Sequence, residues 1–335
     1  MKRGSIQAIT AVLLGASLVL AAAQASAESW RMAHKMPPDS VEGKLFQRFA
    51  DLVEEYTGGE LTVEVFPNEQ LGKDDTVLEQ LQIGTIHVYP EGGSYLQKWV
   101  PEMKWTSAPF LFDDREHWAR FMQSDLAKDW LQKIEDEAGI AVIGDSSAFV
   151  RGPYRVLVSK PEVDGLEDMD GLKLRMHPDE LASAAWTHLG AEVRTLPWTE
   201  VYESIDRGIV DAVNSPIALV EPMTFYEVAP NISRHDEYPQ GIAFMTNAQA
   251  FNALDEETRN AVLRAYDDAA AESRQVMDQE ASESIERMKE KGVTYQELDT
   301  QPFVERMKSF YEEAQRSGEM PEGFLEAVEA TRVES

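Results

Sequence analysis

The sequence predicts an α/β protein with two lobes, and three observations lead to this fold class. Candidate strands and helices alternate over residues 30–89, and a similar alternation restarts over residues 140–213. Such alternation is typical of open, mostly parallel sheets covered by helices. The third observation is a polar helix predicted from Asp255 to Lys291, several times longer than a typical helix of about 11 residues. A helix of this length can bridge two lobes with a ligand cleft between them.

The first section has a β-α-β-α-β order. After Ser40, a favoured capping residue, apolar side chains recur at helical spacing, and Leu61, Val63 and Val65 later alternate as in a half-buried strand. The expected elements are a strand over Trp30–Ala33, a helix opening at Ser40, a strand over 61–65, a helix over Asp74–Gln82 and a strand over Ile86–Tyr89. Sheets of this type bind ligands beyond the carboxyl ends of their strands.

The second section repeats the pattern. In the stretch DGLKLRMHPDE, apolar residues alternate with Lys173 and Arg175, which predicts a short strand ended by His177-Pro178. The expected strands are Ile140–Ile143, Arg155–Val158, Lys173–Met176, Glu192–Thr195 and Val210–Val213, with helices over Asp179–Leu189 and Thr199–Arg207. We therefore predict one lobe from residues 28–152 with 240–279, and a second from residues 153–239 with 280–335.

The N-terminus, residues 1–27, is typical of a secretory signal peptide. Lys2 and Arg3 precede an apolar run, and Ala25-Ser26-Ala27 fits a cleavage site. Cleavage is favoured over a membrane anchor because polar residues interrupt the run, which is short for a span of about 20 residues. The chain has no cysteine, so it offers no thiol for a lipid or a disulfide. These features predict a protein free in a bacterial periplasm.

The length and the charge limit the number of domains and the kinds of binding partner. Removing 27 of the 335 residues leaves 308, which suggests roughly two domains. The net charge changes from −29 to −31, because the removed segment holds two basic and no acidic residues. This acidity argues against binding to nucleic acid or to an anionic membrane surface.

Motifs of common enzyme classes are absent from the sequence. It lacks G-x-S-x-G, G-x-x-x-x-G-K, G-x-G-x-x-G and H-E-x-x-H. The six histidines are dispersed, and the serines of Gly144–Phe149 have no evident base nearby. We therefore expect neither catalysis nor a metal or cofactor.

Polar residues gather at the ends of predicted strands. Arg155 opens one strand and Arg175 closes the next, Glu91 and Asn214-Ser215 follow two others, and Asp74 opens a helix. Each residue alone is most simply a surface group. Their shared placement at strand ends instead favours a binding cleft.

Seven segments together carry a resemblance to a known family. They are MAH (Met32–His34), VEEYTGGELTVEVFPNEQLG (Val53–Gly72), APFLF (Ala108–Phe112), LEDMDGLKLRM (Leu166–Met176), LGAEVRTLPWTEVYES (Leu189–Ser204), GIVDAVNSP (Gly208–Pro216) and FYEVAP (Phe225–Pro230). In order and spacing they are similar to the dicarboxylate-type (DctP-like) solute-binding proteins of tripartite ATP-independent periplasmic (TRAP) transporters. The resemblance implies two lobes that close on one small molecule, and membrane permease subunits that import it with an ion gradient.

The resemblance also implies roles for single residues. In this family the arginine of the GLKLR segment commonly pairs with a ligand carboxylate, and here it is Arg175. Its planar guanidinium matches two carboxylate oxygens, which lysine cannot copy. Arg155 matches an assisting position, and Trp198 matches an aromatic residue that packs against the ligand.

Further positions match less specifically. His34, Asp74 and Glu91 match first-lobe residues that can contact polar groups of the ligand. One departure concerns Asn214-Ser215-Pro216, where the family often has Glu-Asn-Pro. Because Ser215 replaces an asparagine that can contact the ligand, altered polar contacts are expected from Asn214 and Ser215.

The charge of the ligand stays open at this point. Arg155 and Arg175 favour a hydroxy-, sugar- or amino-carboxylate. Glu91, Asp74 and Trp198 would also suit an ammonium group, through ion pairing and cation–π contact. An amine without a carboxylate would require Arg175 to pair internally, with Glu91 or Asp74.

Three classes of function fit these features. The signal peptide, the two-lobed pattern and the seven segments favour a binding protein, expected to be a monomer, that delivers a solute to permease subunits. A ligand-sensing subunit would need only the same ligand-driven closure. A periplasmic enzyme on this scaffold lacks support, because no nucleophile–base pair is evident.

Overall fold

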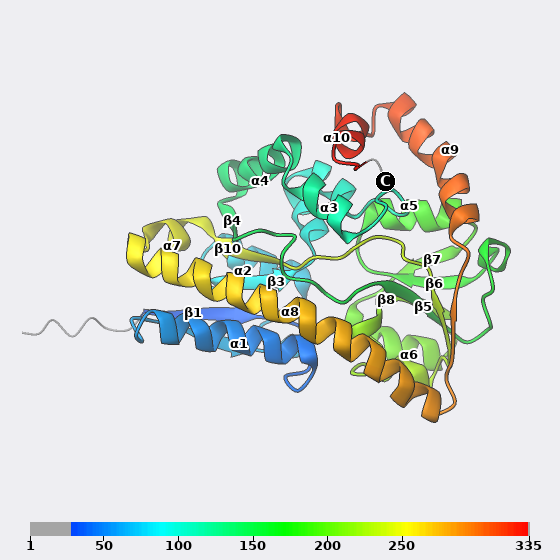
Figure 1. Ribbon diagram of the computed structural model, residues 1–335, viewed down its shortest axis with the longest axis horizontal. Helices are drawn as coiled ribbons and strands as arrows, with labels where there is room; N and C mark the ends of the chain where they lie inside the picture. The colour runs from blue at the N-terminus through cyan, green and yellow to red at the C-terminus, as the bar shows by residue number, and fades with distance from the viewer. Residues whose placement is uncertain (1–27, 334–335) are drawn as a thin grey trace, which may run out of the picture.

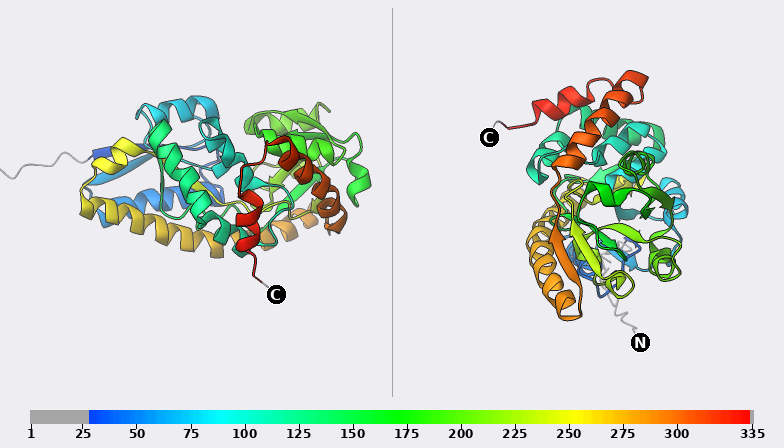
Figure 2. Two further views of the ribbon diagram at one scale, coloured as in Figure 1. Left: turned by 90° about the horizontal axis from the view of Figure 1, so that it is seen from above. Right: turned by 90° about the vertical axis from the view of Figure 1, so that its right-hand side faces the viewer.

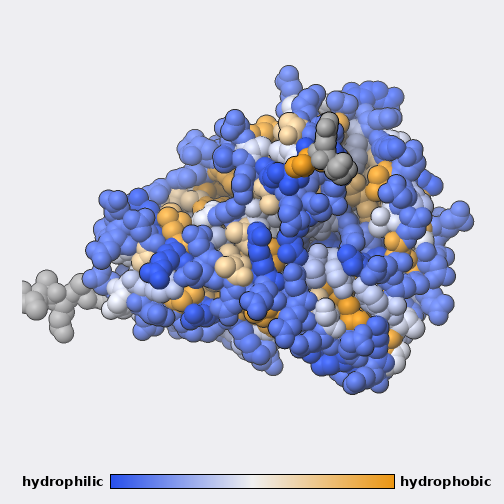
Figure 3. Space-filling view, viewed as in Figure 1, coloured by the Kyte–Doolittle hydropathy of each residue, from blue (hydrophilic) through white to orange (hydrophobic). Residues whose placement is uncertain are grey.

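The computed structural model describes residues 28–333, so the predicted signal peptide lies outside the described residues. These residues form two lobes, each built around one mixed sheet covered by helices (Figure 1). The face shown in Figure 3 is mostly hydrophilic, as the dispersed charged residues predict. None of the helices in residues 28–333 has both the length and the apolar character of a membrane span.

The first sheet has the strand order β2-β1-β3-β10-β4. Its strands are β1 (Glu28–Ala33), β2 (Leu61–Phe66), β3 (Val88–Glu91), β4 (Ile140–Ile143) and β10 (Ala243–Asn247). Strand β10 runs antiparallel to β3 and β4, whereas β1 pairs parallel with β2 and β3. The accompanying helices are α1 (Val41–Tyr56), α2 (Asp74–Gln82), α3 (Arg115–Met122), α4 (Asp125–Ala138), α7 (Ala248–Ala253) and the 3-10 helices η1 (Gly93–Lys98) and η2 (Pro101–Ser107).

The second sheet has the order β11-β9-β5-β8-β6-β7. Its strands are β5 (Arg155–Ser159), β6 (Lys173–Met176), β7 (Glu192–Thr195), β8 (Ala212–Pro216), β9 (Asn231–Arg234) and β11 (Thr294–Glu297). Strand β5 is antiparallel to β8 and β9, and β6 pairs parallel with β7 and β8. The helices include α5 (Glu180–His188), α6 (Val201–Asp206) and α9 (Gln301–Ser317), and short 3-10 helices η3 (Leu166–Met169), η4 (Trp198–Glu200), η5 (Ile217–Leu219) and η6 (Phe225–Glu227). The predicted mostly parallel character is confirmed, with β10 and β5 as the reversed strands.

The long helix α8 (Glu256–Glu290) spans both lobes, as predicted (Figures 1 and 2). It packs against α1 and β4 of one lobe and against η5 and β11 of the other. The last helix, α10 (Phe324–Ala330), places Phe324 on Trp105 and Trp130, which belong to η2 and α4. The residue boundaries of the lobes stay a prediction.

Helices α1, α5 and α8 begin at the residues that the sequence indicated. Ser40, Asp179 and Asp255 each accept a hydrogen bond from the backbone N–H three residues later, at 3.0, 2.9 and 3.0 Å. Each cap satisfies a backbone group that the first turn leaves unpaired. Asp179 thereby fixes the start of α5 just after β6.

Two strands lie further along the chain than predicted. The prediction placed one over Ile86–Tyr89 and another over Val210–Val213, whereas the structure has β3 at Val88–Glu91 and β8 at Ala212–Pro216. Pairing with β10 extends β3 to Glu91, and pairing with β5 extends β8 to Pro216. Both partners are distant in sequence, so the local apolar pattern does not reveal these ends.

Candidate ligand-binding site

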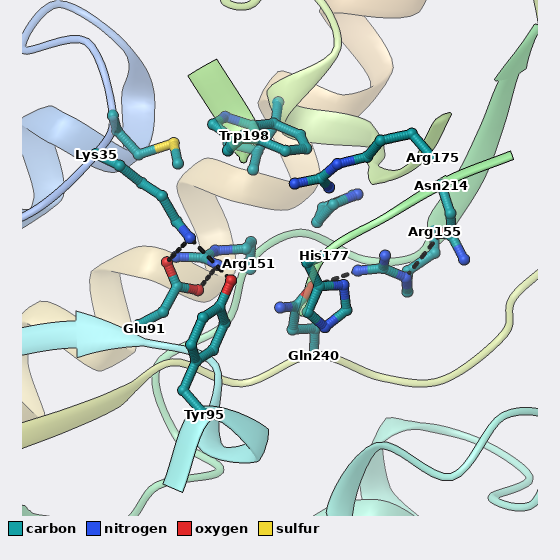
Figure 4. A pocket seen from close by; sticks show the side chains of 13 residues that line it. Lys35, Glu91, Tyr95, Arg151, Arg155, Arg175, His177, Trp198, Asn214 and Gln240 are labelled. Carbon is teal, nitrogen blue, oxygen red and sulfur yellow. Dashed lines mark hydrogen bonds and ion pairs between the residues drawn. The ribbon is translucent and has the colours of Figure 1, made fainter. Parts of the chain in front are cut away.

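A cavity lies between the lobes, where polar side chains of both sheets meet (Figure 4). Its volume is about 30 Å³, room for about two water molecules, so a larger solute does not fit in this arrangement of the lobes. Residues of both lobes and of the segments between them line it, namely Lys35, Met36, Glu91, Tyr95, Arg151, Arg155, Arg175, His177, Trp198, Asn214, Pro216, Leu219 and Gln240.

The sheet topology explains why these residues converge. Arg175 lies near the carboxyl end of β6 and pairs with Val213 of the parallel strand β8, which runs three residues further to Pro216. Because β5 runs the other way, its first residue, Arg155, lies opposite Pro216. In the first sheet the reversed strand β10 likewise begins opposite Glu91, the last residue of β3. The amino ends of reversed strands therefore join the carboxyl ends of the others at the cavity.

Arg175 is a buried cation, with an exposed fraction of 3%. Its Nε and Nη2 both donate to the Leu196 carbonyl oxygen, at 3.0 and 2.7 Å, and its guanidinium lies 5.2 Å from the ring centre of Trp198. No carboxylate within residues 28–333 lies within ion-pair distance of it. Burial lowers the pKa of Arg175 to about 10, although Tyr95 acts in the opposite direction. An anion at this position would offset that cost.

Arg155 is also buried, but its charge is paired within the protein. Its Nε donates to Glu237 at 3.0 Å and to the Asn214 side chain at 3.1 Å. Its Nη1 donates to Gln240, and its guanidinium lies 4.7 Å from the ring centre of Tyr238. Arg155 is therefore held rigidly at the cavity wall by its own counterion.

Trp198 lines the cavity, whereas Ser215 does not. The Trp198 ring packs edge-on against Phe225 at 5.0 Å, and its buried Nε1 has no hydrogen-bond partner in the described part of the chain. Ser215 lies in β8 and its hydroxyl donates to the Pro216 carbonyl oxygen at 2.9 Å. Because side chains alternate along a strand, Ser215 faces away from its neighbour Asn214, and it does not line the cavity.

Lys35 is the centre of the first-lobe side of the cavity. Its Nζ lies 3.0 Å from Asp74, from Glu91 and from the Tyr95 hydroxyl. Asp74 also accepts a hydrogen bond from the Tyr89 hydroxyl. Although burial lowers the pKa of Lys35, Glu91 raises it above its usual range. The ammonium group thus donates to Asp74 and Tyr95 and forms an ion pair with Glu91, all within the protein.

Arg151 joins this side of the cavity to α1. Its Nε and Nη2 donate to the two oxygens of Glu42, at 3.0 and 2.6 Å, and its Nη1 donates to Glu91. Burial alone would raise the pKa of Glu91, but Arg151 and Lys35 outweigh it and lower the pKa to about 2. We call Lys35, Arg151, Glu42, Glu91 and Asp74 the first-lobe charge cluster.

His34 lies beside this cluster but not on the cavity. Its Nδ1 accepts a hydrogen bond from the Met36 backbone at 3.2 Å, and its ring contacts Phe46 edge-on. Burial, with a further effect of Arg151, lowers the pKa of His34 to about 4. The ring is therefore neutral at ordinary pH.

The structure brings together five of the eight residues that the sequence indicated. Those on the cavity wall are Arg175, Arg155, Trp198, Glu91 and Asn214. Asp74 reaches the cavity only through Lys35, and His34 and Ser215 face elsewhere.

Sequence reasoning missed several lining residues, above all Lys35, Tyr95, Arg151 and Gln240. Lys35 could have been found, because it follows a predicted strand as closely as Glu91 does. Arg151 and Gln240 lie on segments between strands, where no periodic pattern indicates position. Within residues 28–333, no group of three or more acidic or histidine side chains is arranged to hold a metal ion.

This fold and cavity define a two-lobed binding protein for a small polar solute. Residues 32–317 match the family described as bacterial extracellular solute-binding protein, family 7 (DctP). The chain belongs to this family, whose members are non-enzymatic periplasmic components that bind small molecules and work with TRAP membrane subunits.

Individual proteins agree with this assignment. A solute-binding protein from Roseobacter denitrificans is 28% identical over 89% of this chain and 90% of its own. The C4-dicarboxylate-binding periplasmic protein DctP of Rhodobacter capsulatus is 26% identical over 79% of this chain and 78% of its own. A solved TRAP solute-binding protein from Roseobacter denitrificans, with bound β-D-glucuronate, has a TM-score of 0.83 and 24% identity, covering 91% of this chain and 100% of that chain.

Proposed function

We propose that this protein captures a small organic acid in the periplasm and delivers it to TRAP membrane subunits for uptake driven by an ion gradient. The observation that carries the proposal is Arg175, a buried cation on the cavity wall without a carboxylate partner in residues 28–333. Burying a charge is costly unless a counterion accompanies it. A ligand carboxylate would supply that counterion. Two of the proteins compared above also bind carboxylates. One is the C4-dicarboxylate-binding protein of Rhodobacter capsulatus, and the other is the solved protein with bound β-D-glucuronate.

Other wall residues have supporting roles in this proposal. Arg155 and Asn214, both bonded to Glu237, form a fixed wall beside the bound acid. Trp198 covers the Arg175 guanidinium and offers its unpaired Nε1–H to a ligand oxygen. The proposal includes removal of residues 1–27, a monomeric mature protein and the two lobes predicted from the sequence.

The charge pairing gives less support to a ligand that is a simple amine. Such a ligand would need Arg175 to pair with Glu91 or Asp74. Instead Lys35 forms ion pairs with both of these carboxylates, and Arg151 forms a second ion pair with Glu91. Both carboxylates already pair with cations other than Arg175.

Native mass spectrometry of the mature protein, purified from periplasm without added ligand, tests the proposal. We expect a retained small acid, and a thermal-shift panel should show stabilisation by at least one carboxylate. The matched carboxamides serve as controls and should not stabilise. Stabilisation by uncarboxylated amines alone would contradict the proposal. Uptake of the labelled acid by vesicles containing the membrane subunits distinguishes transport from sensing.

A further inference from the structure

We propose that the cavity selects monocarboxylates and disfavours dicarboxylates, because carboxylates of the protein already pair with every lining cation except Arg175. This inference rests on the proposed function and names the class of acid. Figure 4 shows the two sides of the cavity, with Lys35 and Glu91 on one side and Arg175 and Arg155 on the other.

The lining lysine and the lining arginines other than Arg175 are already paired with carboxylates. Lys35 has Asp74 and Glu91 each at 3.0 Å. Arg151 binds Glu42 through two nitrogens and Glu91 through the third. Arg155 has Glu237 at 3.0 Å. Each is buried and has its carboxylate before any ligand binds.

Negative charge gathers on the side of the cavity opposite Arg175. The first-lobe charge cluster has the cations Lys35 and Arg151 but three carboxylates, so its formal charge is negative. The positive end is therefore at Arg175, and the opposite end is negative.

These charges have different consequences for the two classes of acid. One ligand carboxylate bound to Arg175 neutralises the lone cation. A second carboxylate on the same molecule, reaching the opposite side, would meet Glu91 on the cavity wall, with Asp74 behind Lys35, and would find no free cation there. Like charges in a buried site are strongly unfavourable, and such contacts are a common basis of specificity.

The cavity wall also offers uncharged donors, Tyr95 beside Lys35 and Gln240 beside Arg155. The Tyr95 hydroxyl accepts from Lys35 and keeps its own hydrogen for a ligand oxygen. The Gln240 carbonyl oxygen accepts from Arg155, which leaves its amide N–H groups available. These groups suit hydroxyls, so the favoured ligand is a monocarboxylate whose other end carries hydroxyl groups, with or without an amino group.

Calorimetric titration of the mature protein with matched acids tests this inference. The pairs are gluconate and glucarate, galactonate and galactarate, glycerate and tartronate, and succinamate and succinate. In each pair that binds, we expect the monoacid to bind at least tenfold more tightly. Equal or tighter binding of the diacid would overturn the selectivity but leave the organic-acid function intact. Binding by none of the eight acids would count against both.

A variant that removes one carboxylate charge tests the cause of the preference for monoacids. Glu91→Gln removes one carboxylate that faces the second ligand end, so the preference for the monoacid should shrink at least threefold. Asp75→Asn is the matched control, because Asp75 lies next to Asp74 on α2 but has a 92% exposed side chain. It should leave the ratio of monoacid to diacid affinity unchanged. If Glu91→Gln fails to fold, Asp74→Asn provides the same comparison. A ratio that stays at its original value in a folded variant would refute the role of these carboxylates.

Discussion

The guanidinium of Arg175 and the carbonyl group of Leu196 are joined by two hydrogen bonds, from Nε at 3.0 Å and from Nη2 at 2.7 Å. Leu196 directly follows β7, so this contact connects β6 to the turn that leads to Trp198. It fixes the orientation of the arginine before a ligand arrives. A preorganised side chain loses less conformational freedom on binding, which favours affinity.

Replacement of Arg175 should therefore remove most of the affinity for an acid. We expect Arg175→Ala to cost about 2–5 kcal/mol of binding free energy. Arg175→Lys should also bind weakly, because an ammonium cannot reproduce the planar fork. Arg194→Ala is the matched control, since Arg194 lies opposite Arg175 in the β6–β7 register but is exposed. Calorimetry makes the comparison, and wild-type affinity in both Arg175 variants would exclude a ligand role for this residue.

Local sequence patterns predicted the fold where elements depend on local interactions. Helix α2 has the predicted bounds, and α8 begins at its predicted cap, Asp255. Strands β9, β10 and β11 were not predicted. β10 is buried on both faces and so lacks the alternation that indicates a strand, and β11 is short and largely exposed.

Trp198 was indicated by the family resemblance alone, and local patterns predicted site residues only at the ends of predicted strands. Arg175 and Arg155 were found in this way, and Lys35 was overlooked despite the same signal. Glu237 could not have been found, because it pairs with Arg155 from a loop 82 residues away. Pairing over that distance follows from the path of the chain between β9 and β10, which leaves no local pattern in the sequence.

Ligand binding should change the overall shape of the molecule. The cavity of about 30 Å³ is too small to admit an organic acid unless the lobes separate, so a hinge motion is expected. Small-angle scattering should give a larger radius of gyration for the ligand-free protein than for the protein saturated with its acid. Identical scattering curves under both conditions would argue against a closing hinge.

Contacts across the rim of the cleft should slow ligand release. Lys73 forms an ion pair with Glu200 at 2.5 Å, and Thr199 donates to Glu69 at 3.1 Å, each joining one lobe to the other. We expect Lys73→Ala to accelerate dissociation and to weaken its salt dependence, because this exposed pair is screened by salt. Stopped-flow measurements at low and high salt provide the test. Lys98→Ala is the control, since Lys98 pairs only within the first lobe among the described residues. The ligand should dissociate from this variant at the wild-type rate.

The stability of the protein should fall between pH 7 and pH 5, in part because of His34. Its folded pKa is about 4, lowered from 6.5 mainly by burial, so the unfolded state takes up a proton first as the pH falls. The stabilisation is complete above pH 6.5 and is lost towards pH 4, with about 2 kcal/mol lost by pH 5. Urea unfolding should show a shallower pH dependence for His34→Asn, which retains an acceptor for the Met36 N–H. An unchanged slope would mean that His34 does not titrate in this way.

Loss of Arg151 should destabilise the folded protein, since this residue holds two buried carboxylates from different elements. Glu42 of α1 and Glu91 of β3 would each lose a partner, and breaking a buried ion pair typically costs about 3–5 kcal/mol. We expect Arg151→Met to unfold at clearly lower urea concentration. The double variant Arg151→Met with Glu42→Gln removes one stranded charge together with its partner, so it should cost less than the sum of the single changes. Additive costs in this cycle would show that Arg151 and Glu42 do not act as a pair.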